Sequence, residues 1–369
     1  MSNSFEVPEP ILNTPFAEPA HHWYIREGEE PQKRPGRRPA IVYPPRDERK
    51  DKHVLWRLTD GTLRPSQEYS PGYELALVNL LRERVAAWRK EVAAGGGNVT
   101  RTTLQLLQWW RREGRSQRLF FAQIEAAETI IFLKEARPDF LQGVSVPRDE
   151  PSEEGYSGFV RYACKMATGS GKTTVMGMLA AWSILNKVHN RGDARFSDVV
   201  LVVCPNVTIR SRLGELDPEA GEASIYRTRD LVPPELMKDL TQGKVLTMNW
   251  HVFEPQAVNQ GGERSRVMKA GREERTIETI QIGTKTTTAR GNRYVTQDDY
   301  ERQVGAGMLK VIEEERDKEG VLKRVRVESV RYVESDTALI NRLLGREVGS
   351  KKNILVMNDE AHHAYRIKS

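Results

Sequence analysis

An alternation of apolar strands with one amphipathic helix, in the middle of the chain, constrains the fold most. Two apolar runs of strand length, 159–164 and 198–204, enclose a helical stripe of Val175, Met178, Leu179, Trp182 and Leu185. The second run carries uninterrupted Val and Leu, which is typical of a strand buried on both faces of a parallel sheet. Residues 245–248 and 354–357 are further apolar runs of this kind. We therefore predict an α/β fold with a parallel sheet.

A glycine-rich segment, Met166-Ala-Thr-Gly-Ser-Gly-Lys-Thr173, lies between the first strand and the helix. Glycines let backbone amides curl around an anion, and the N-terminus of the following helix adds positive potential. In such a loop Lys172 would reach the β- and γ-phosphates of ATP, and the Thr173 hydroxyl would bind Mg²⁺. Met166 replaces the first glycine of the usual pattern. The predicted nucleotide-binding residues are Thr168, Gly169, Ser170, Gly171, Lys172, Thr173 and Thr174.

Two carboxylates follow the last apolar run. Asp359 and Glu360 would lie at the C-terminal edge of the parallel sheet, where ligands of such folds bind. Asp359 would hold Mg²⁺ through water, and Glu360 would orient and deprotonate an attacking water. On its own, such a pair also fits the solvated start of a helix. Together with the loop at Lys172 it favours a site for ATP and Mg²⁺.

The glycine-rich segment and the Asp-Glu-Ala-His of residues 359–362 resemble motifs I and II of superfamily 2 DEAD/DEAH-box helicases and translocases. The doubled His362-His363 is similar to the restriction-enzyme-like branch, especially the helicase subunit of type III restriction enzymes. The resemblance implies two RecA-like lobes that hydrolyse ATP while moving on double-stranded DNA, with His362 coupling the nucleotide state to the second lobe. It also implies a following nuclease domain and a methyltransferase or specificity subunit as a partner.

Other segments fit the same resemblance. Phe120-Phe-Ala-Gln-Ile-Glu-Ala126 looks like the adenine-recognition segment, with Gln123 as the amide that reads the base; a plain surface glutamine is the alternative. Pro205-Asn-Val-Thr208 resembles motif Ia, in which Pro205, Asn206 and Thr208 would contact DNA phosphates, and the start of a helix is the alternative. Asn249, at the end of the third apolar run, is a further candidate for a DNA contact. No Cys/His cluster in the sequence has the spacing of a zinc site.

Composition and periodicity divide the chain into four regions. Residues 1–70 are rich in Pro and charge and predict a basic, extended arm with room for one short strand. Apolar spacings of three and four over residues 71–150 predict a helical lead-in that carries the adenine-recognition segment. Residues 151–254 and 351–369 would form a RecA-like ATP-binding lobe. Residues 255–350 are too many for a loop and predict an inserted subdomain of mixed strand and helix.

The net charge of +6 is concentrated in residues 31–57, which contain nine Lys/Arg and three Asp/Glu. Such a basic stretch fits attraction to nucleic acid, although a disordered tail carries a similar charge. No apolar run approaches the length of about 20 residues that a membrane span needs, and the first residues lack a secretory signal. We therefore expect a cytoplasmic protein with no membrane partner. Cys164 and Cys204 lie in apolar runs, where we expect both to be buried.

The sequence contains no motif III, no second lobe and no arginine finger. We therefore expect it to be the N-terminal portion of a DNA-dependent ATPase, poorly active alone, because an arginine finger contributes roughly 10³–10⁵ in rate. The alternative is a truncated, nucleotide-gated DNA-binding module without appreciable hydrolysis. A transporter ATPase is disfavoured, because no Leu-Ser-Gly-Gly-type signature lies between Lys172 and Asp359.

Overall fold

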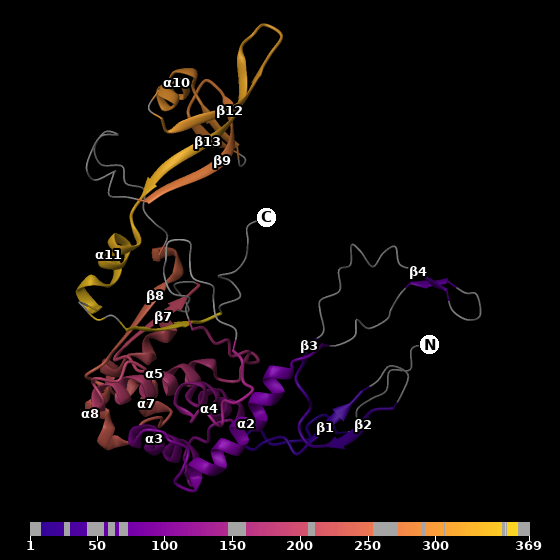
Figure 1. Ribbon diagram of the computed structural model, residues 1–369, viewed down its shortest axis with the longest axis vertical. Coiled ribbons are helices and arrows are strands. Elements are labelled where there is room, and N and C mark those ends of the chain that lie inside the picture. Colours follow the sequence, from indigo (N-terminus) through magenta and orange to yellow (C-terminus); the bar gives the residue numbers. More distant parts are fainter. Residues whose placement is uncertain are drawn as a thin grey trace. The chain divides into compact units, whose positions relative to one another are not determined.

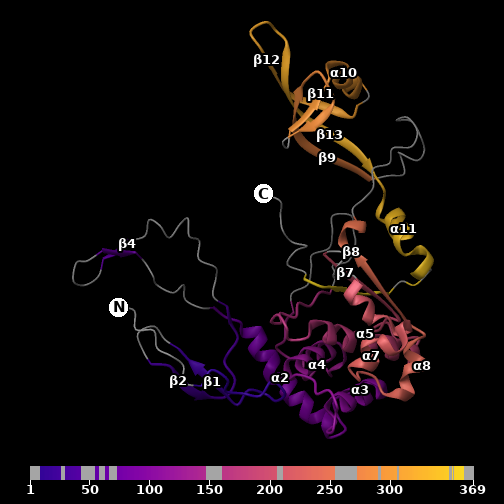
Figure 2. The same ribbon diagram turned by 180° about the vertical axis from the view of Figure 1, so that it is seen from behind.

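The computed structural model describes residues 9–25, 30–42, 55–57, 63–65, 73–146, 160–205, 211–253, 272–289, 292–305, 307–348, 351 and 353–360. By its contacts the chain divides into two compact units. The first comprises residues 1–202, 208–247 and 353–357, and the second comprises residues 203–207, 248–352 and 358–369. Figure 1 and Figure 2 show the elements from opposite sides, coloured along the chain.

Among the described residues, three helices precede the glycine-rich loop, in the region where the apolar periodicity predicts helix. They are α2 (Ala76–Ala93), α3 (Arg101–Arg111) and α4 (Phe121–Glu135). Thr100 caps α3, because its side chain accepts a hydrogen bond from the Thr103 N–H. Trp88 on α2 packs edge to face on Phe132 of α4, with ring centroids 5.7 Å apart, and both rings are buried. The helical lead-in thus has an apolar core of its own.

The glycine-rich loop leads into a helix and a sheet of three parallel strands. The helix is α5 (Lys172–His189), and the strands, in the order β14-β7-β8, are β14 (Leu355–Asn358), β7 (Val199–Cys204) and β8 (Lys244–Asn249). The first four residues of β7 are at most 4% exposed, as expected for a central strand. The expected α/β fold with a parallel sheet is therefore confirmed at this level. Figure 1 shows α5 and the lead-in helices gathered beside these strands.

Short helical turns connect β7 to β8 within the described residues. They are η1 (Leu213–Leu216), η2 (Pro218–Ala223), α7 (Ile225–Thr228), η3 (Pro234–Leu236) and α8 (Met237–Leu240). Tyr226 on α7 is fully buried and donates its hydroxyl to the carbonyl of Leu216, 2.8 Å away. Burial raises the pKa of the Tyr226 phenol well above its ordinary value. The connection between β7 and β8 is thus packed into the first unit. One further turn, η4 (Trp250–Phe253), follows β8.

The strand expected over residues 159–164 is not formed in the described part of that run. Residues 160–167 have no regular structure, Val160 is 51% exposed, and Cys164 is exposed rather than buried. Cys204 is buried, as predicted. An apolar run becomes a strand only where a neighbour completes its hydrogen bonds, and the sheet that forms uses β14 and β8 as the neighbours of β7.

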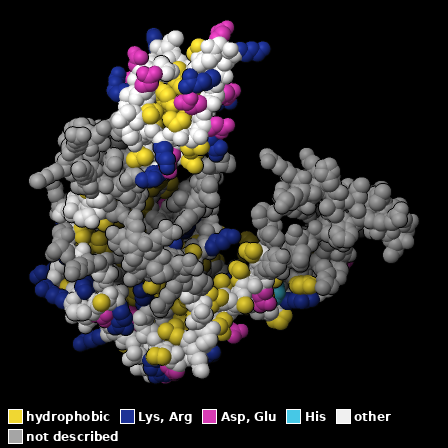
Figure 3. Space-filling view, turned by 45° about the horizontal axis from the view of Figure 1, so that its top comes forward, with side chains coloured by type: hydrophobic (Ala, Val, Ile, Leu, Met, Phe, Trp, Pro, Cys, Tyr) yellow, Lys and Arg dark blue, Asp and Glu magenta, His cyan; other side chains and the backbone are white. Residues whose placement is uncertain are grey.

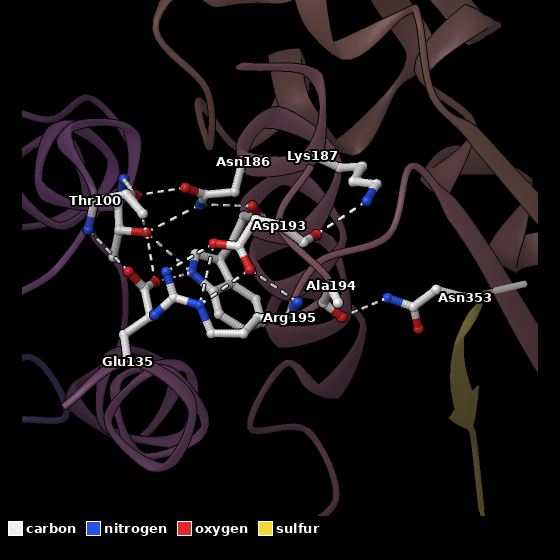
Figure 4. Close-up of polar contacts among 10 residues, drawn as sticks. Thr100, Glu135, Asn186, Lys187, Asp193, Ala194, Arg195 and Asn353 are labelled. Carbon is white, nitrogen blue, oxygen red and sulfur yellow. Dashed lines mark hydrogen bonds and ion pairs between the residues drawn. The ribbon is translucent and has the colours of Figure 1, made fainter. Parts of the chain in front are cut away.

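A buried polar network joins the helical lead-in to α5 (Figure 4). The Glu135 carboxylate, 2% exposed as a residue, accepts hydrogen bonds from the Thr100 N–H at 2.9 Å, the Thr103 hydroxyl at 2.6 Å and the Trp182 indole N–H at 2.7 Å. Asn186 donates from Nδ2 to the Thr103 oxygen at 2.9 Å. Buried polar groups cost free energy unless they are paired, so this network fixes α5 at one position against α3 and α4.

The segment between α5 and β7 anchors the start of β14. The side-chain amide of Asn353 donates to the carbonyl oxygens of Ala194 and Phe196, each at 2.8 Å (Figure 4). In the same turn the Arg195 guanidinium donates to the Asp193 carboxylate at 2.7 Å. That hydrogen bond lowers the pKa of Asp193 and raises the pKa of Arg195. The approach to β14 is therefore set by hydrogen bonds from the Asn353 side chain to backbone carbonyls that lie far from it in the sequence.

The N-terminal region is more structured than the extended arm that its composition predicts. It contains three antiparallel pairs: β1 (His21–Tyr24) with β2 (Gln32–Pro35), β3 (Ile41–Val42) with β6 (Tyr73–Glu74), and β4 (Leu55–Arg57) with β5 (Leu63–Pro65). The Arg37 guanidinium also forms a two-pronged ion pair with the Glu125 carboxylate of α4, at 2.5 and 2.6 Å. Short strands pair locally here because the Pro-rich spacing leaves no long run for a larger sheet.

The second unit contains a mixed sheet of five strands in the order β10-β11-β9-β13-β12, with only β11 and β9 parallel. The elements are β9 (Arg272–Ile282), β10 (Thr287–Ala289), β11 (Asn292–Val295), α10 (Gln297–Gly305), β12 (Leu309–Arg316), β13 (Leu322–Val333) and α11 (Asp336–Val348). Its core is Ile280, Val295, Tyr300, Leu309, Leu322, Val325 and Val327. Basic and acidic side chains are intermixed on the described surface seen in Figure 3. Strand and helix are therefore mixed between residues 255 and 350, as the sequence predicts.

Candidate nucleotide-binding site

The glycine-rich loop forms a tight turn that opens α5. Gly169 and Gly171 both adopt left-handed backbone angles, with φ of 79° and 82°, which side chains other than glycine disfavour. Between them, Ser170 donates its hydroxyl to the carbonyl of Ala167, 2.6 Å away. Gly171 is the N-cap of α5, and its carbonyl accepts the N–H of Thr174 at 3.0 Å. The expected loop-to-helix transition is therefore present, although no regular strand precedes it in residues 160–167.

The predicted loop residues differ in exposure. Thr168 and Gly169 are exposed, Ser170 to Thr173 are half-buried, and Thr174 is buried. Lys172 and Thr173 occupy the first turn of α5, a helix of 18 residues. The N–H groups in the first turn of a helix have no acceptor within the helix and point beyond its N-terminus, where the positive end of the helix dipole also lies. This end of α5 thus favours an anion, and Lys172 adds a positive charge to it.

Gln123 is held against this loop. The residue is 6% exposed, so the alternative of a plain surface glutamine is wrong. Its Oε1 accepts the N–H of Phe120 at 2.9 Å and so caps α4, while its Nε2 donates to the carbonyl of Ser170 at 3.0 Å. The contact is so close that a Cβ built on Gly171 would lie 2.1 Å from Gln123 Nε2. One amide therefore connects the predicted adenine-recognition helix to the predicted phosphate loop.

A cavity of about 450 Å³ lies between the loop and the start of α4. This volume is within the range of roughly 300–1,000 Å³ that small-molecule sites have. Its lining combines four expected positions, Gln123, Gly169, Gly171 and Thr174, with residues that the motifs did not assign to the site. The complete lining is Phe16, Gln117, Arg118, Leu119, Phe120, Gln123, Gly169, Gly171, Thr174 and Arg229.

The residues missed by sequence reasoning come from three different segments. Arg118 lies two residues before the first residue of the adenine-recognition segment, so its position near that segment was a usable signal. Arg229 belongs to the connection between β7 and β8, and Phe16 belongs to the N-terminal region, more than a hundred residues from the loop. Neither lies in a periodic pattern or a motif. Only tertiary packing brings them to the cavity.

A second group of predicted residues lies at the carboxyl ends of the three parallel strands and belongs to the second unit. Asp359 directly follows β14, and its N–H donates to the carbonyl of Val203 in β7 at 2.9 Å. Pro205 directly follows β7, and Asn249 ends β8 with its side-chain oxygen accepting the N–H of His251 at 3.2 Å. In a parallel sheet these ends share one edge, so Asp359, Pro205 and Asn249 lie along the same edge.

Glu360 is in the left-handed backbone region, with φ of 51°. This conformation is uncommon for a residue with a side chain, and such residues gather at functional sites more often than elsewhere. His362, Asn206 and Thr208 lie outside the described residues. Thr173 belongs to the first unit and Asp359 to the second.

Oxygen donors of the predicted metal site are of the type that Mg²⁺ uses. The hydroxyl of Thr173 and the carboxylate of Asp359 are hard ligands, and Mg²⁺ is usually bound by one or two carboxylates together with substrate phosphates. Among the described residues, no group of three or more His, Cys, Asp and Glu side chains could hold a metal ion. Each of these two oxygen donors is of a chemical type that Mg²⁺ accepts together with substrate phosphates.

Comparisons of the chain with family models, with curated proteins and with solved structures find no match. Within the part of the chain that the structure describes, no helix is long and apolar enough to cross a membrane.

Proposed function

We propose that this chain is the ATP-binding part of a DNA-dependent ATPase of the superfamily 2 helicase or translocase kind, similar to the helicase subunit of type III restriction enzymes. One observation carries the proposal. Gln123, from the segment resembling an adenine-recognition motif, contacts the carbonyl of Ser170 in the segment resembling motif I, beside a cavity of about 450 Å³. Two segments that fit the same resemblance and lie far apart in the sequence are therefore in contact.

In this proposal the chain's own groups bind and orient ATP. The loop amides and Lys172 hold the β- and γ-phosphates, and Gln123 reads the adenine edge. The resemblance assigns Mg²⁺ to the Thr173 hydroxyl and, through water, to the Asp359 carboxylate, and the ion would neutralise charge on the phosphates. Glu360 orients the attacking water and accepts its proton, and His362 transmits the nucleotide state to a second RecA-like lobe.

DNA binding is proposed from the sheet edge and the basic segment. Pro205, Asn206, Thr208 and Asn249 would contact DNA phosphates, which position a protein on a duplex without reading its sequence. The excess of positive charge in residues 31–57 adds attraction for the same partner. A cytoplasmic restriction system with a methyltransferase or specificity subunit is the setting that the resemblance favours.

Steady-state ATP hydrolysis with and without duplex DNA tests this proposal. Hydrolysis should need Mg²⁺ and should be abolished by Glu360→Gln, while nucleotide binding by that variant persists, because Glu360 is assigned to the water and not to the phosphates. Lys238→Ala is a matched control, since Lys238 is exposed on α8 and outside the site. Binding without hydrolysis by the wild-type protein would favour the nucleotide-gated DNA-binding module. Hydrolysis that survives Glu360→Gln would contradict the assignment of the base.

A further inference from the structure

A short loop of the N-terminal region presents Phe16 at the cavity. The side-chain amide of Asn13 closes this loop: Oδ1 accepts the N–H groups of Ala20 and His21 at 2.8 and 3.1 Å, and Nδ2 donates to the His21 carbonyl at 2.8 Å. Three hydrogen bonds from one side chain give the loop a defined shape. Phe16 lies within it and is half-buried.

The same loop is docked on the N-terminus of α4. The carbonyl of Pro15 accepts the N–H of Phe121, the first residue of α4, at 2.8 Å. The Phe16 ring lies 5.5 Å from the Phe120 ring, and the Arg118 guanidinium lies 4.4 Å from the Phe16 ring centroid. A backbone hydrogen bond, an aromatic contact and a cation–π contact thus hold Phe16 beside the segment that carries Gln123.

A second contact fixes the N-terminal region to α4 one turn further on. The Arg37 guanidinium makes two hydrogen bonds to the Glu125 carboxylate, and the side chains are 24% and 15% exposed. Paired, partly buried contacts of this geometry are among the stronger ion pairs. The N-terminal region is therefore attached to α4 at two points.

A third segment of the lining, the turn that carries Arg229, is also held in place. Arg229 donates to the side-chain oxygen of Gln117 at 3.1 Å. The buried guanidinium of Arg115 donates to the carbonyl oxygens of Arg229 and Asp230, each at 2.9 Å. Burial lowers the pKa of Arg115, and Asp230 has a left-handed φ of 52°. The turn that carries Arg229 is thus shaped by the loop between α3 and α4.

The lining of the cavity includes two chemically different groups of residues, called here the phosphate end and the base end. The phosphate end consists of the glycines and Thr174 at the start of α5, which suit phosphate. The base end consists of the aromatic ring of Phe16 and the guanidinium groups of Arg118 and Arg229, and flat groups of this kind stack on nucleobases. We propose that the N-terminal region forms one wall of the nucleotide pocket, with Phe16 as the aromatic residue that packs on the base. This inference rests on the proposed function, because it assigns the base end of the same site.

Calorimetric titration with two ligands separates the base end from the phosphate end. ATP and inorganic tripolyphosphate, both with Mg²⁺, share the phosphate chain, but only ATP has a base. Phe16→Ala should weaken ATP binding about tenfold, since stacking on an aromatic side chain contributes roughly 1–3 kcal/mol and tenfold corresponds to about 1.4 kcal/mol. Tripolyphosphate binding should be unchanged.

Two further variants keep the result interpretable. Phe16→Leu preserves an apolar contact with Phe120 but removes the aromatic face, so its ATP affinity should also fall below that of the wild type. Tyr24→Ala is the matched control, because Tyr24 lies in β1 of the same region with the Arg34 guanidinium 3.6 Å from its ring centroid, and it does not line the cavity. It should change neither affinity.

The outcomes distinguish the two proposals. Wild-type protein that binds neither ligand would overturn the proposed function, and the inference with it. If the wild type binds both ligands, equal ATP affinity for wild type and both Phe16 variants would overturn only the inference. So would an equal loss for ATP and tripolyphosphate, because that pattern is the signature of a general structural role. Selective loss of ATP affinity supports the inference.

Discussion

Gly171→Ala should be more damaging than the same change at Gly169, although both residues lie in one loop. Both have nearly equal left-handed angles, with φ of 82° and 79°. They differ in their surroundings, because a Cβ at Gly171 would lie 2.1 Å from Gln123 Nε2, whereas a Cβ at Gly169 would meet nothing within 4 Å. The pair therefore separates the cost of the backbone angle from the cost of the contact with Gln123.

The expected magnitudes follow from these two terms. A left-handed angle costs a residue with a side chain about 1–2 kcal/mol, and this term applies to both variants. At Gly171 the Gln123 amide must also move away from the Ser170 carbonyl, which loses a hydrogen bond worth about 0.5–1.5 kcal/mol. Gly171→Ala should thus lower the free energy of unfolding by about 1 kcal/mol more than Gly169→Ala does.

Urea denaturation followed by tryptophan fluorescence and circular dichroism measures this difference, with the fluorescence dominated by residues of the first unit such as Trp88, Trp110 and Trp182. A double-mutant cycle makes the test sharper. In a Gln123→Ala background the amide is gone, so the two glycine variants should become equally unstable. Equal stabilities in the wild-type background, or a difference that survives Gln123→Ala, would refute the contact between Gln123 and the loop.

Two further predictions concern the framework behind the site. Glu135→Gln should lower the free energy of unfolding by about 2–3 kcal/mol, because it replaces one oxygen acceptor of the buried network with an NH₂ group that faces a donor. Glu113→Gln, at an exposed position, is the control and should have little effect in the same denaturation assay. Equal effects of the two substitutions would contradict the network. The hydrogen bond from Arg195 lowers the pKa of Asp193. The Asp193 carboxylate therefore stabilises the fold at pH values above the ordinary pKa of Asp, ~4, and this contribution is lost as the pH falls through the lowered pKa. Asp193→Asn should therefore flatten the loss of stability below about pH 4, and a pH profile identical to that of the wild type would count against it.

Periodicity in the sequence was sufficient to locate α2 to α5 and the three strands of the parallel sheet. The helices and β7 bury one face or both, so their apolar spacing records their own environment, whereas β14 carries an apolar run at the edge of the sheet with Val356 54% exposed. The run at 159–164 shows the limit of such reasoning. Its residues have strand-forming character, but strand formation depends on a hydrogen-bonding neighbour, and no pattern within the run reports whether that neighbour is present.

The candidate site was predictable where its residues are neighbours in the sequence and form a recognisable motif. Lys172, Thr173 and the loop glycines occupy consecutive positions, and Gln123 lies in a recognisable segment that precedes them. Phe16 and Arg229 were not predictable, because their roles depend on hydrogen bonds such as that from the Phe121 N–H to the Pro15 carbonyl. The prediction of an extended arm for residues 1–70 has the same cause. Charge and proline content do not report contacts with α4, and these contacts hold the N-terminal region in place.

Equilibrium titration of Mg·ATP into wild-type protein, Lys172→Ala and Lys238→Ala tests the central claim most directly. Saturable binding by the wild type and by Lys238→Ala is expected. Lys172→Ala should weaken binding at least about tenfold, since hydrogen bonds to charged groups contribute roughly 1.5–3 kcal/mol. Equal ATP affinities for the wild type and Lys172→Ala, or no binding by the wild type, would contradict the assignment of this loop as a nucleotide site.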